Sequence, residues 1–264
     1  MGWNYLWVLA VVAAVLCAVG FYKYVYFLSI GYGFAVAGIG ITLMIFFGKQ
    51  MQFVHFIQCI LFVIYGSRLS GFLLYREINN SLYRKTLEEA TASGKTMPFF
   101  VKIFIWIFVT VLYVCQTSPV FFRQYNHAQD TTIPWIGILI SAVAVTIEEL
   151  ADVQKSKQKA KNPHMVATKG LYRMVRCPNY FGEILFWTGV FLGGTTALNF
   201  WGQWVMAAFA YAAILLIMFT SARRLEKRQI SRYGNLPEYK AYADKTPIIL
   251  PLIPLYHLVK EDNK

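Results

Sequence analysis

Charged residues are scarce in this sequence. Asp, Glu, Lys and Arg together make up only 14% of the 264 residues, whereas 57% are hydrophobic and the mean hydropathy is +0.47. A soluble domain usually carries about 25% charged residues and at most about half apolar ones. The shortage of charge therefore excludes a water-soluble globule and predicts an integral membrane protein. An aromatic content of 17% agrees with this, because Trp and Tyr concentrate at membrane interfaces.

Cysteine is also rare, and its spacing excludes two kinds of site. None of the four cysteines belongs to a C-x-x-C pair and three lie inside apolar runs, so neither a zinc site nor a disulfide framework is indicated. The four histidines lie far apart without an H-E-x-x-H motif, so no metal site is predicted. No G-x-G-x-x-G motif follows a strand, which excludes a soluble Rossmann module.

Acidic residues are few as well, and 13 Asp and Glu against 25 Lys and Arg give a net charge of +12. Nucleic-acid binding is one interpretation of this excess. The positive-inside bias of a membrane protein is the favoured one, because the charges lie in loops between apolar runs. We therefore expect no nucleic-acid partner, and we expect the basic inner side to attract an anionic cofactor.

Long apolar runs, by contrast, are abundant. A transmembrane helix needs about 20 mostly apolar residues. Seven segments qualify: 3–20, 25–47, 53–75, 98–118, 132–151, 180–198 and 201–222. The first lacks a basic region and a clear cleavage site, so it is interpreted as a span and not as a signal peptide. The sequence predicts an all-α integral membrane protein with seven transmembrane helices, forming one domain over residues 1–264.

The basic residues predict the orientation. If the N-terminus is outside, all 25 lysines and arginines lie on the inner side except Lys49 and Arg123, which are outside, and Arg68, which is within the third span. This asymmetry predicts an N-out, C-in topology in a bacterial inner membrane or an endoplasmic reticulum membrane. The long polar segments are then cytosolic and are expected to form a cofactor pocket: 76–97, 152–178 and 223–264.

Acidic side chains gather at the end of the fifth span. Glu148 and Asp152 are spaced i, i+4 and share a helix face, and Lys155 lies on the same face. Acids at this depth are costly unless they meet a partner, water or a ligand. A solvated helix end is the simpler alternative, but the preceding apolar run and the nearby lysine favour a site.

A second polar motif leads into the sixth span. Arg173 and Arg176 precede Pro178, a residue favoured in a first helical turn. Such a helix N-terminus offers free N–H groups and a positive dipole, and guanidiniums bind phosphates well. Asn179 and Glu183 follow on one face and can bind an amide, a ribose or an arginine. The alternative, that both arginines only mark the inner side, does not explain Asn179 and Glu183.

These motifs resemble the C-terminal domain of the steroid 5-alpha-reductase family. The resemblance rests on Glu-x-x-Ala-Asp-x-Gln-Lys at 148–155 and on Gly-Leu-Tyr-Arg-x-x-Arg-x-Pro-Asn-Tyr-Phe-Gly-Glu at 170–183. It covers about residues 135–255 and is closest to the bacterial-type branch, whose substrates are unassigned. Upstream, Tyr65-Gly66-Ser67-Arg68 is similar to the family's tyrosine and arginine on the corresponding helix.

The resemblance implies an NADPH-dependent enzyme that reduces a conjugated C=C bond in an apolar lipid or steroid taken from the bilayer, and we expect the protein to be a monomer. Tyr65 would be the catalytic donor to the carbonyl oxygen, since a phenol with a reference pKa of about 10 keeps its proton at pH 7; a packed tyrosine is the alternative. The cofactor contacts would come from Asp152, Arg173, Arg176, Asn179, Tyr180 and Glu183, with Arg68, Arg224 and Tyr239 as further candidates.

The chain departs from the family in two places. It has no adjacent Gln-Glu pair in an early helix, which steroid-reducing members use to hold the 3-keto group, and this puts a 3-oxo-steroid substrate in doubt. Cys177 stands where the bacterial-type motif has His. Two neighbouring arginines can activate a thiol, and a small packed residue is the alternative.

Two other classes of function compete with a reductase. Isoprenylcysteine and phospholipid methyltransferases, which bind S-adenosylmethionine, are also small membrane bundles with an Arg-x-Pro-x-Tyr turn. Their motif carries His where Cys177 stands, and segment 148–155 points to the reductase branch. A non-enzymatic lipid-binding or scaffold protein is the third interpretation, and it predicts no convergence of polar residues on one site.

Overall fold

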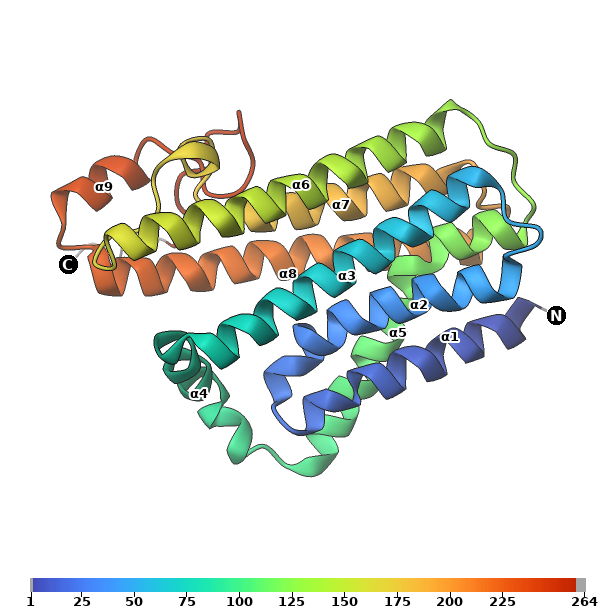
Figure 1. Ribbon diagram of the computed structural model, residues 1–264, viewed down its shortest axis with the longest axis horizontal. Helices are drawn as coiled ribbons and strands as arrows, with labels where there is room; N and C mark the ends of the chain where they lie inside the picture. Colours follow the sequence, from blue (N-terminus) through green and yellow to red (C-terminus); the bar gives the residue numbers. More distant parts are fainter. Residues whose placement is uncertain (1, 260–264) are drawn as a thin grey trace. The chain divides into compact units, whose positions relative to one another are not determined.

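The computed structural model describes residues 2–259, and no strand occurs among them. The helices are α1 (Gly2–Cys17), η1 (Ala18–Phe21), η2 (Tyr24–Leu28), α2 (Ile30–Phe47), α3 (Phe53–Asn79), α4 (Ser81–Lys95), α5 (Phe99–Tyr125), α6 (Thr132–Lys161), η3 (Gly170–Arg173), α7 (Pro178–Thr195), α8 (Trp201–Tyr233) and α9 (Pro237–Ala243) (Figure 1). The prediction of an all-α fold is confirmed.

Five helices in the described part of the chain are long and apolar enough to cross a membrane. They are Asn4–Phe21, Ile30–Phe47, Phe53–Asn79, Phe99–Tyr125 and Trp201–Tyr233. These five match predicted spans one to four and seven, and they make the chain a membrane protein. The other two predicted spans fall on α6 and α7, which are not among the five. The count of seven spans and the N-out orientation therefore stay predictions.

The chain divides into two compact units, Met1–Ile138 with Val190–Ala210 and Leu139–Gly189 with Tyr211–Lys264. The first unit contains α1 to α5, the first residues of α6 and α8, and the last residues of α7. The second contains the rest of α6, α7 and α8, together with η3, α9 and the C-terminal segment. The assignment of one membrane domain with a reductase-like region at 135–255 stays a prediction.

In the first unit, α2 packs against α1 and α3, and small residues set the distance between α2 and α3. A Cβ added to Gly66 would lie 2.1 Å from the carbonyl oxygen of Gly33, so the two backbones touch. The hydroxyl of Ser70 donates to the carbonyl of Ile30 at 2.7 Å in the same contact. Close approach at small residues is the usual way in which apolar helices associate in lipid, where burial of apolar surface gives no drive.

In the second unit, the C-terminal segment pairs with the start of α7. The backbone N–H groups of Arg176 and Cys177 donate to the carbonyls of Pro247 and Ile248 at 2.8 and 2.9 Å. Cys177 and Ile248 also belong to an apolar cluster, whose other buried members are Ile184, Ala222 and Ile249. The tail is thus part of the core that positions the first turn of α7.

Candidate cofactor site

Three side chains from different elements of the second unit meet beside the first turn of α7. The Asn179 amide donates to the Asp152 carboxylate at 2.6 Å. The Tyr172 hydroxyl from η3 donates to the Asn179 side-chain oxygen at 3.2 Å and lies 3.3 Å from the carbonyl oxygen of Ala151. Asp152 is 7% exposed and Tyr172 is 5% exposed. The structure thus brings together two residues predicted from separate motifs, and adds Tyr172.

The loop that carries Tyr172 is fixed to α6 by a glutamine. Gly170 has φ +69°, a conformation that glycine adopts without strain. The Gln154 side-chain oxygen accepts from the backbone N–H of Leu171 at 2.8 Å. A Cβ on Gly170 would meet that oxygen at 2.3 Å. Glycine is therefore required at the turn that delivers Tyr172 and the exposed Arg173.

The buried acids lie one helical turn away from this cluster. Glu148 on α6 and Glu183 on α7 are 2% and 7% exposed, and Glu183 accepts from the Trp187 indole N–H at 3.0 Å. Gly182 lets the two helices approach, because a Cβ there would lie 2.5 Å from Cγ of Glu148 and 3.2 Å from the carbonyl oxygen of Ala144. Charged groups this deeply buried are expensive unless hydrogen-bonded, and the Trp187 indole supplies one such bond to Glu183.

Replacing Gly182 with alanine should therefore push α6 and α7 apart within this unit. Overpacking of this kind costs about 1–3 kcal/mol, and the melting temperature in detergent should fall accordingly. Gly71→Ala is the matched control, because no atom lies within 4 Å of a Cβ added to Gly71 in α3. A Gly182→Ala protein that melts like the Gly71→Ala protein would contradict the close contact.

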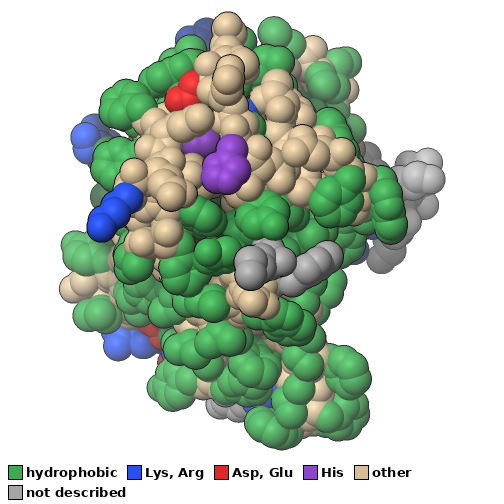
Figure 2. Space-filling view, turned by 90° about the vertical axis from the view of Figure 1, so that its right-hand side faces the viewer, with side chains coloured by type: hydrophobic (Ala, Val, Ile, Leu, Met, Phe, Trp, Pro, Cys, Tyr) green, Lys and Arg blue, Asp and Glu red, His purple; other side chains and the backbone are tan. Residues whose placement is uncertain are grey.

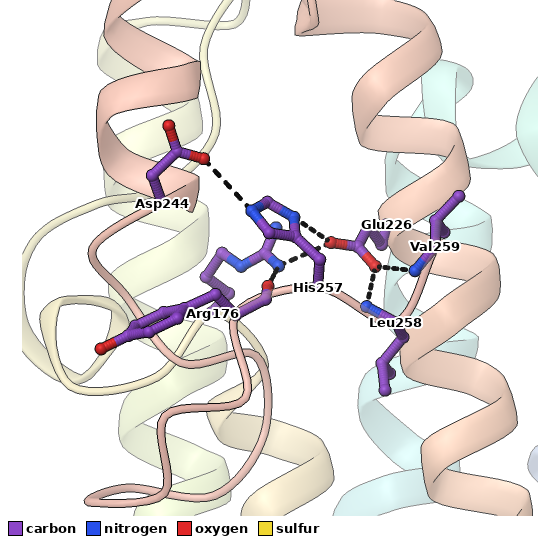
Figure 3. Close-up of polar contacts among 7 residues, drawn as sticks. Arg176, Glu226, Asp244, His257, Leu258 and Val259 are labelled. Atoms are coloured by element: carbon purple, nitrogen blue, oxygen red, sulfur yellow. Dashed lines mark hydrogen bonds and ion pairs between the residues drawn. The ribbon is translucent and has the colours of Figure 1, made fainter. Parts of the chain in front are cut away.

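Arg176 occupies a different environment from the one expected for a phosphate ligand. Its Nη2 donates to Oε1 of Glu226 at 2.7 Å and to the carbonyl oxygen of Tyr256. The two side chains of the ion pair are 1% and 0% exposed (Figure 3). This geometry favours a positioning role for Arg176, in which it holds the C-terminal segment against α7 and α8.

Glu226 is the centre of that network. Its second carboxylate oxygen accepts from the backbone N–H groups of Leu258 and Val259 at 2.7 and 3.0 Å. His257 lies between two acids, with Nδ1 3.1 Å from Glu226 and Nε2 3.1 Å from Asp244 (Figure 3). Sequence reasoning missed this role of Glu226, because its partners are 31 to 50 positions away.

The remaining predicted cofactor residues of this unit differ in exposure. Arg173 and Arg224 are exposed, and Tyr180 is half-buried. Tyr239 in α9 is 2% exposed, and burial raises the pKa of its phenol. The two exposed guanidiniums are thus the predicted cations that an incoming phosphate can reach directly.

Cys177 is a packed residue. It is 5% exposed, and burial raises the pKa of its thiol to about 12, although the neighbouring Arg176 opposes this shift. A thiol with that pKa is protonated at neutral pH, and the thiolate is the reactive form. The structure therefore favours the small packed residue over the reactive thiol.

Tyr65 and Arg68 belong to α3 of the first unit. Tyr65 is fully buried in α3, and its hydroxyl donates to the Tyr32 hydroxyl of α2 at 2.9 Å. The Tyr32 ring packs on that of Tyr113, with centroids 4.8 Å apart. Arg68 is half-buried one turn further along α3. The phenol of Tyr65 is thus held in a fixed orientation by a second phenol.

Apolar helices of membrane length and a cluster of acid, amide and phenol groups beside the first turn of α7 define a helical membrane protein with a hydrogen-bonded polar cluster in its second unit. The chain matches the family described as "Protein of unknown function (DUF1295)" over residues 8–246. It belongs to that family.

Curated relatives are distant and agree with the resemblance seen in the motifs. The chain is 22% identical to steroid 5-alpha-reductase DET2 of Gossypium hirsutum over 191 residues, which are 70% of this chain and 69% of the cotton protein. It is 20% identical to the Arabidopsis thaliana protein of the same name over 117 residues, 44% of this chain and 39% of that protein. An uncharacterized protein of Schizosaccharomyces pombe, C594.04c, is 25% identical over 176 residues, covering 58% of this chain and 50% of that protein. No solved structure matches the chain.

The resemblance to the steroid 5-alpha-reductase family is thereby confirmed, and the chain is a reductase-like membrane protein. Within residues 2–259, the structure contains no group of three or more His, Cys, Asp and Glu side chains that could hold a metal ion.

Proposed function

We propose that this protein is an NADPH-dependent reductase of a conjugated C=C bond in an apolar lipid. The observation that carries the proposal is the convergence of Asp152, Asn179 and Tyr172 at the first turn of α7. A scaffold protein has no need for a buried, hydrogen-bonded polar cluster built from two family-like motifs. The similarity to two curated proteins named steroid 5-alpha-reductase also supports a reductase.

The residues present fit a dinucleotide. Asp152 can accept from a ribose hydroxyl, and Asn179 can both donate to and accept from an amide. The exposed Arg173 and Arg224 can bind phosphates, which guanidiniums hold through paired charge-assisted hydrogen bonds. The N-terminus of α7 adds N–H groups and a positive dipole. Glu183 and Tyr180 complete the proposed set, while Arg176, Tyr239 and Arg68 would support it.

The bound NADPH would supply the hydride that the β carbon of an enone accepts, and a proton taken from solvent at the α carbon would complete the reduction. In this proposal Tyr65 holds its proton and donates a hydrogen bond to the substrate carbonyl oxygen, which draws electrons away from the double bond. Tyr32 would keep the Tyr65 hydroxyl oriented until substrate replaces that contact. The apolar surroundings would exclude water and strengthen the polarisation.

The substrate is proposed to enter from the bilayer and the cofactor from the cytosolic side, with segments 76–97, 152–178 and 223–264 on that side. The chain lacks the Gln-Glu pair of steroid-reducing members, so an enone lipid other than a 3-oxo-steroid is the first class to screen. A monomer in a bacterial inner membrane or endoplasmic reticulum membrane, without a nucleic-acid partner, completes the proposal.

The test is ligand-dependent melting of the detergent-purified protein. NADPH at 100 times its Kd should raise the free energy of unfolding by about 2.7 kcal/mol, whereas NADH and S-adenosylmethionine should have smaller effects. Nucleotide that co-purifies, detected by its absorbance, would add support. A shift with S-adenosylmethionine alone would overturn the proposal in favour of a membrane methyltransferase, and no shift with any of the three would favour a non-enzymatic protein.

A further inference from the structure

A small cavity lies within the first unit, and none of its lining residues is among those assigned to the reductase. It has a volume of about 10 Å³, and its polar lining comes from His55 and Gln58 of α3 and Arg123 of α5. The other lining residues are Val54, Val120, Pro134, Ile138, Val190 and Gly193. A cavity of this volume holds one water molecule or a guest of similar size.

The polar groups that line the cavity are deeply buried. His55 is 2% exposed, Gln58 is 6% exposed and Arg123 is 3% exposed. Both ring nitrogens of His55, Nε2 of Gln58 and Nε of Arg123 have no hydrogen-bond partner in the described part of the chain. Native proteins rarely leave such atoms unpaired, and each exception calls for an explanation, such as a bound water or ion.

Arg123 is fixed in place by its other nitrogens. Nη1 donates to Thr196 at 2.7 Å and to the carbonyl oxygen of Gly193 at 3.3 Å. Nη2 donates to the carbonyl oxygen of Gln129 and lies 3.9 Å from Asp130. The guanidinium therefore cannot turn away from the cavity without losing these contacts, and only Nε is left for a guest.

The lining is rich in donors. Gln58 Nε2, Arg123 Nε and one His55 nitrogen are N–H donors, and no carboxylate is among the lining residues. Figure 2 shows the face on which the α2–α3 and α5–α6 loops of the first unit lie (Figure 1), and hydrophobic side chains, uncharged polar side chains, backbone and histidine are visible on it, with few charged side chains. The other lining residues offer no side-chain acceptor, and a buried donor without an acceptor is costly.

We propose that this cavity is a binding site for one small hydrogen-bond acceptor, a halide ion or a water molecule, held by His55, Gln58 and Arg123. The guest supplies the acceptor that the three donors need. A neutral histidine also has an acceptor nitrogen, to which water can donate and a halide cannot. The site is independent of the proposed reductase chemistry.

The decisive variant is Gln58→Met, which keeps the length of the side chain and removes its amide. If a guest is bound, the variant loses a hydrogen bond and its melting temperature falls by about 2–4 °C. The matched control is Gln116→Met in α5. Gln116 is 3% exposed with neither amide atom partnered in the described chain, and it does not line the cavity. Removal of that orphaned amide should leave the melting temperature unchanged or raise it.

Chloride titration at constant ionic strength, with gluconate as the replacing anion, separates the two guests. A chloride-dependent rise in melting temperature that Gln58→Met abolishes identifies a halide. Chloride-independent melting with a destabilised Gln58→Met identifies water. If Gln58→Met stabilises the protein as Gln116→Met does, the cavity has no guest and the proposal is wrong. Should Gln58→Met not fold, bromide anomalous scattering and solvent density in a wild-type crystal decide, and absence of both at His55 overturns the proposal.

Discussion

Replacing Glu226 with alanine is expected to destabilise the protein by about 3–5 kcal/mol, because removal of one partner leaves a buried charge uncompensated. The Arg176 and Glu226 side chains of this ion pair are 1% and 0% exposed. The same carboxylate also accepts from the backbone N–H groups of Leu258 and Val259. Its loss therefore releases the C-terminal segment as well as Arg176.

Thermal unfolding in detergent measures this effect, and two further variants make it specific. Glu238→Ala removes an exposed carboxylate of α9 and should change the stability by less than about 0.5 kcal/mol. The double variant Arg176→Met, Glu226→Leu replaces the pair with apolar groups and should recover part of the lost stability, because the N–H groups of Leu258 and Val259 still lack their acceptor. Wild-type melting of Glu226→Ala, or a double variant less stable than Glu226→Ala, would show that the pair is not the main contact of the tail.

Replacing Asn179 with alanine is expected to lower the affinity for NADPH by about 100-fold. The amide orders the Asp152 carboxylate at 2.6 Å and is itself proposed to bind the cofactor, and hydrogen bonds to charged groups contribute about 1.5–3 kcal/mol each. Glu183→Ala should act similarly, because it removes a buried carboxylate of α7 that is proposed to bind the cofactor. Titration of the detergent-purified variants with NADPH measures both affinities.

A fold defect must be separated from a binding defect in this experiment. The ligand-free melting temperatures of both variants should stay within a few degrees of wild type, and Asn235→Ala, which changes an exposed amide near α9, should bind like wild type. Wild-type affinity in both Asn179→Ala and Glu183→Ala would refute the site. A common loss of affinity and of ligand-free stability would instead indicate a structural role.

The membrane character could be predicted from composition because lipid imposes a local rule. Each span must satisfy its own backbone hydrogen bonds and present about 20 apolar residues in succession. Such an apolar run can be recognised from the residues of one segment alone, and five of the predicted spans correspond to helices that are long and apolar enough to cross a membrane. The polar motifs at 148–155 and 170–183 are also short and continuous, so their meeting at Asp152 and Asn179 could be anticipated.

Contacts between distant positions could not be predicted in the same way. Arg123 was counted as an outer-side charge, yet it is 3% exposed and bound to residues about 70 positions away. His55 was considered only as a metal ligand, and its position beside Gln58 and Arg123 depends on the packing of α3 against α5. A signal was available in the spacing of His55 and Gln58, which are i, i+3 on one helix face.

The sequence by itself determined that this is an all-helical membrane protein of a reductase-like family, because composition, apolar run length and short motifs are local properties of the chain. Only the tertiary structure decided which polar groups are paired. It placed Arg176 on Glu226, fifty positions away, and left Arg173 exposed. The physical reason is that a guanidinium binds a phosphate and a carboxylate equally well in principle, and only the three-dimensional packing determines which partner is within reach.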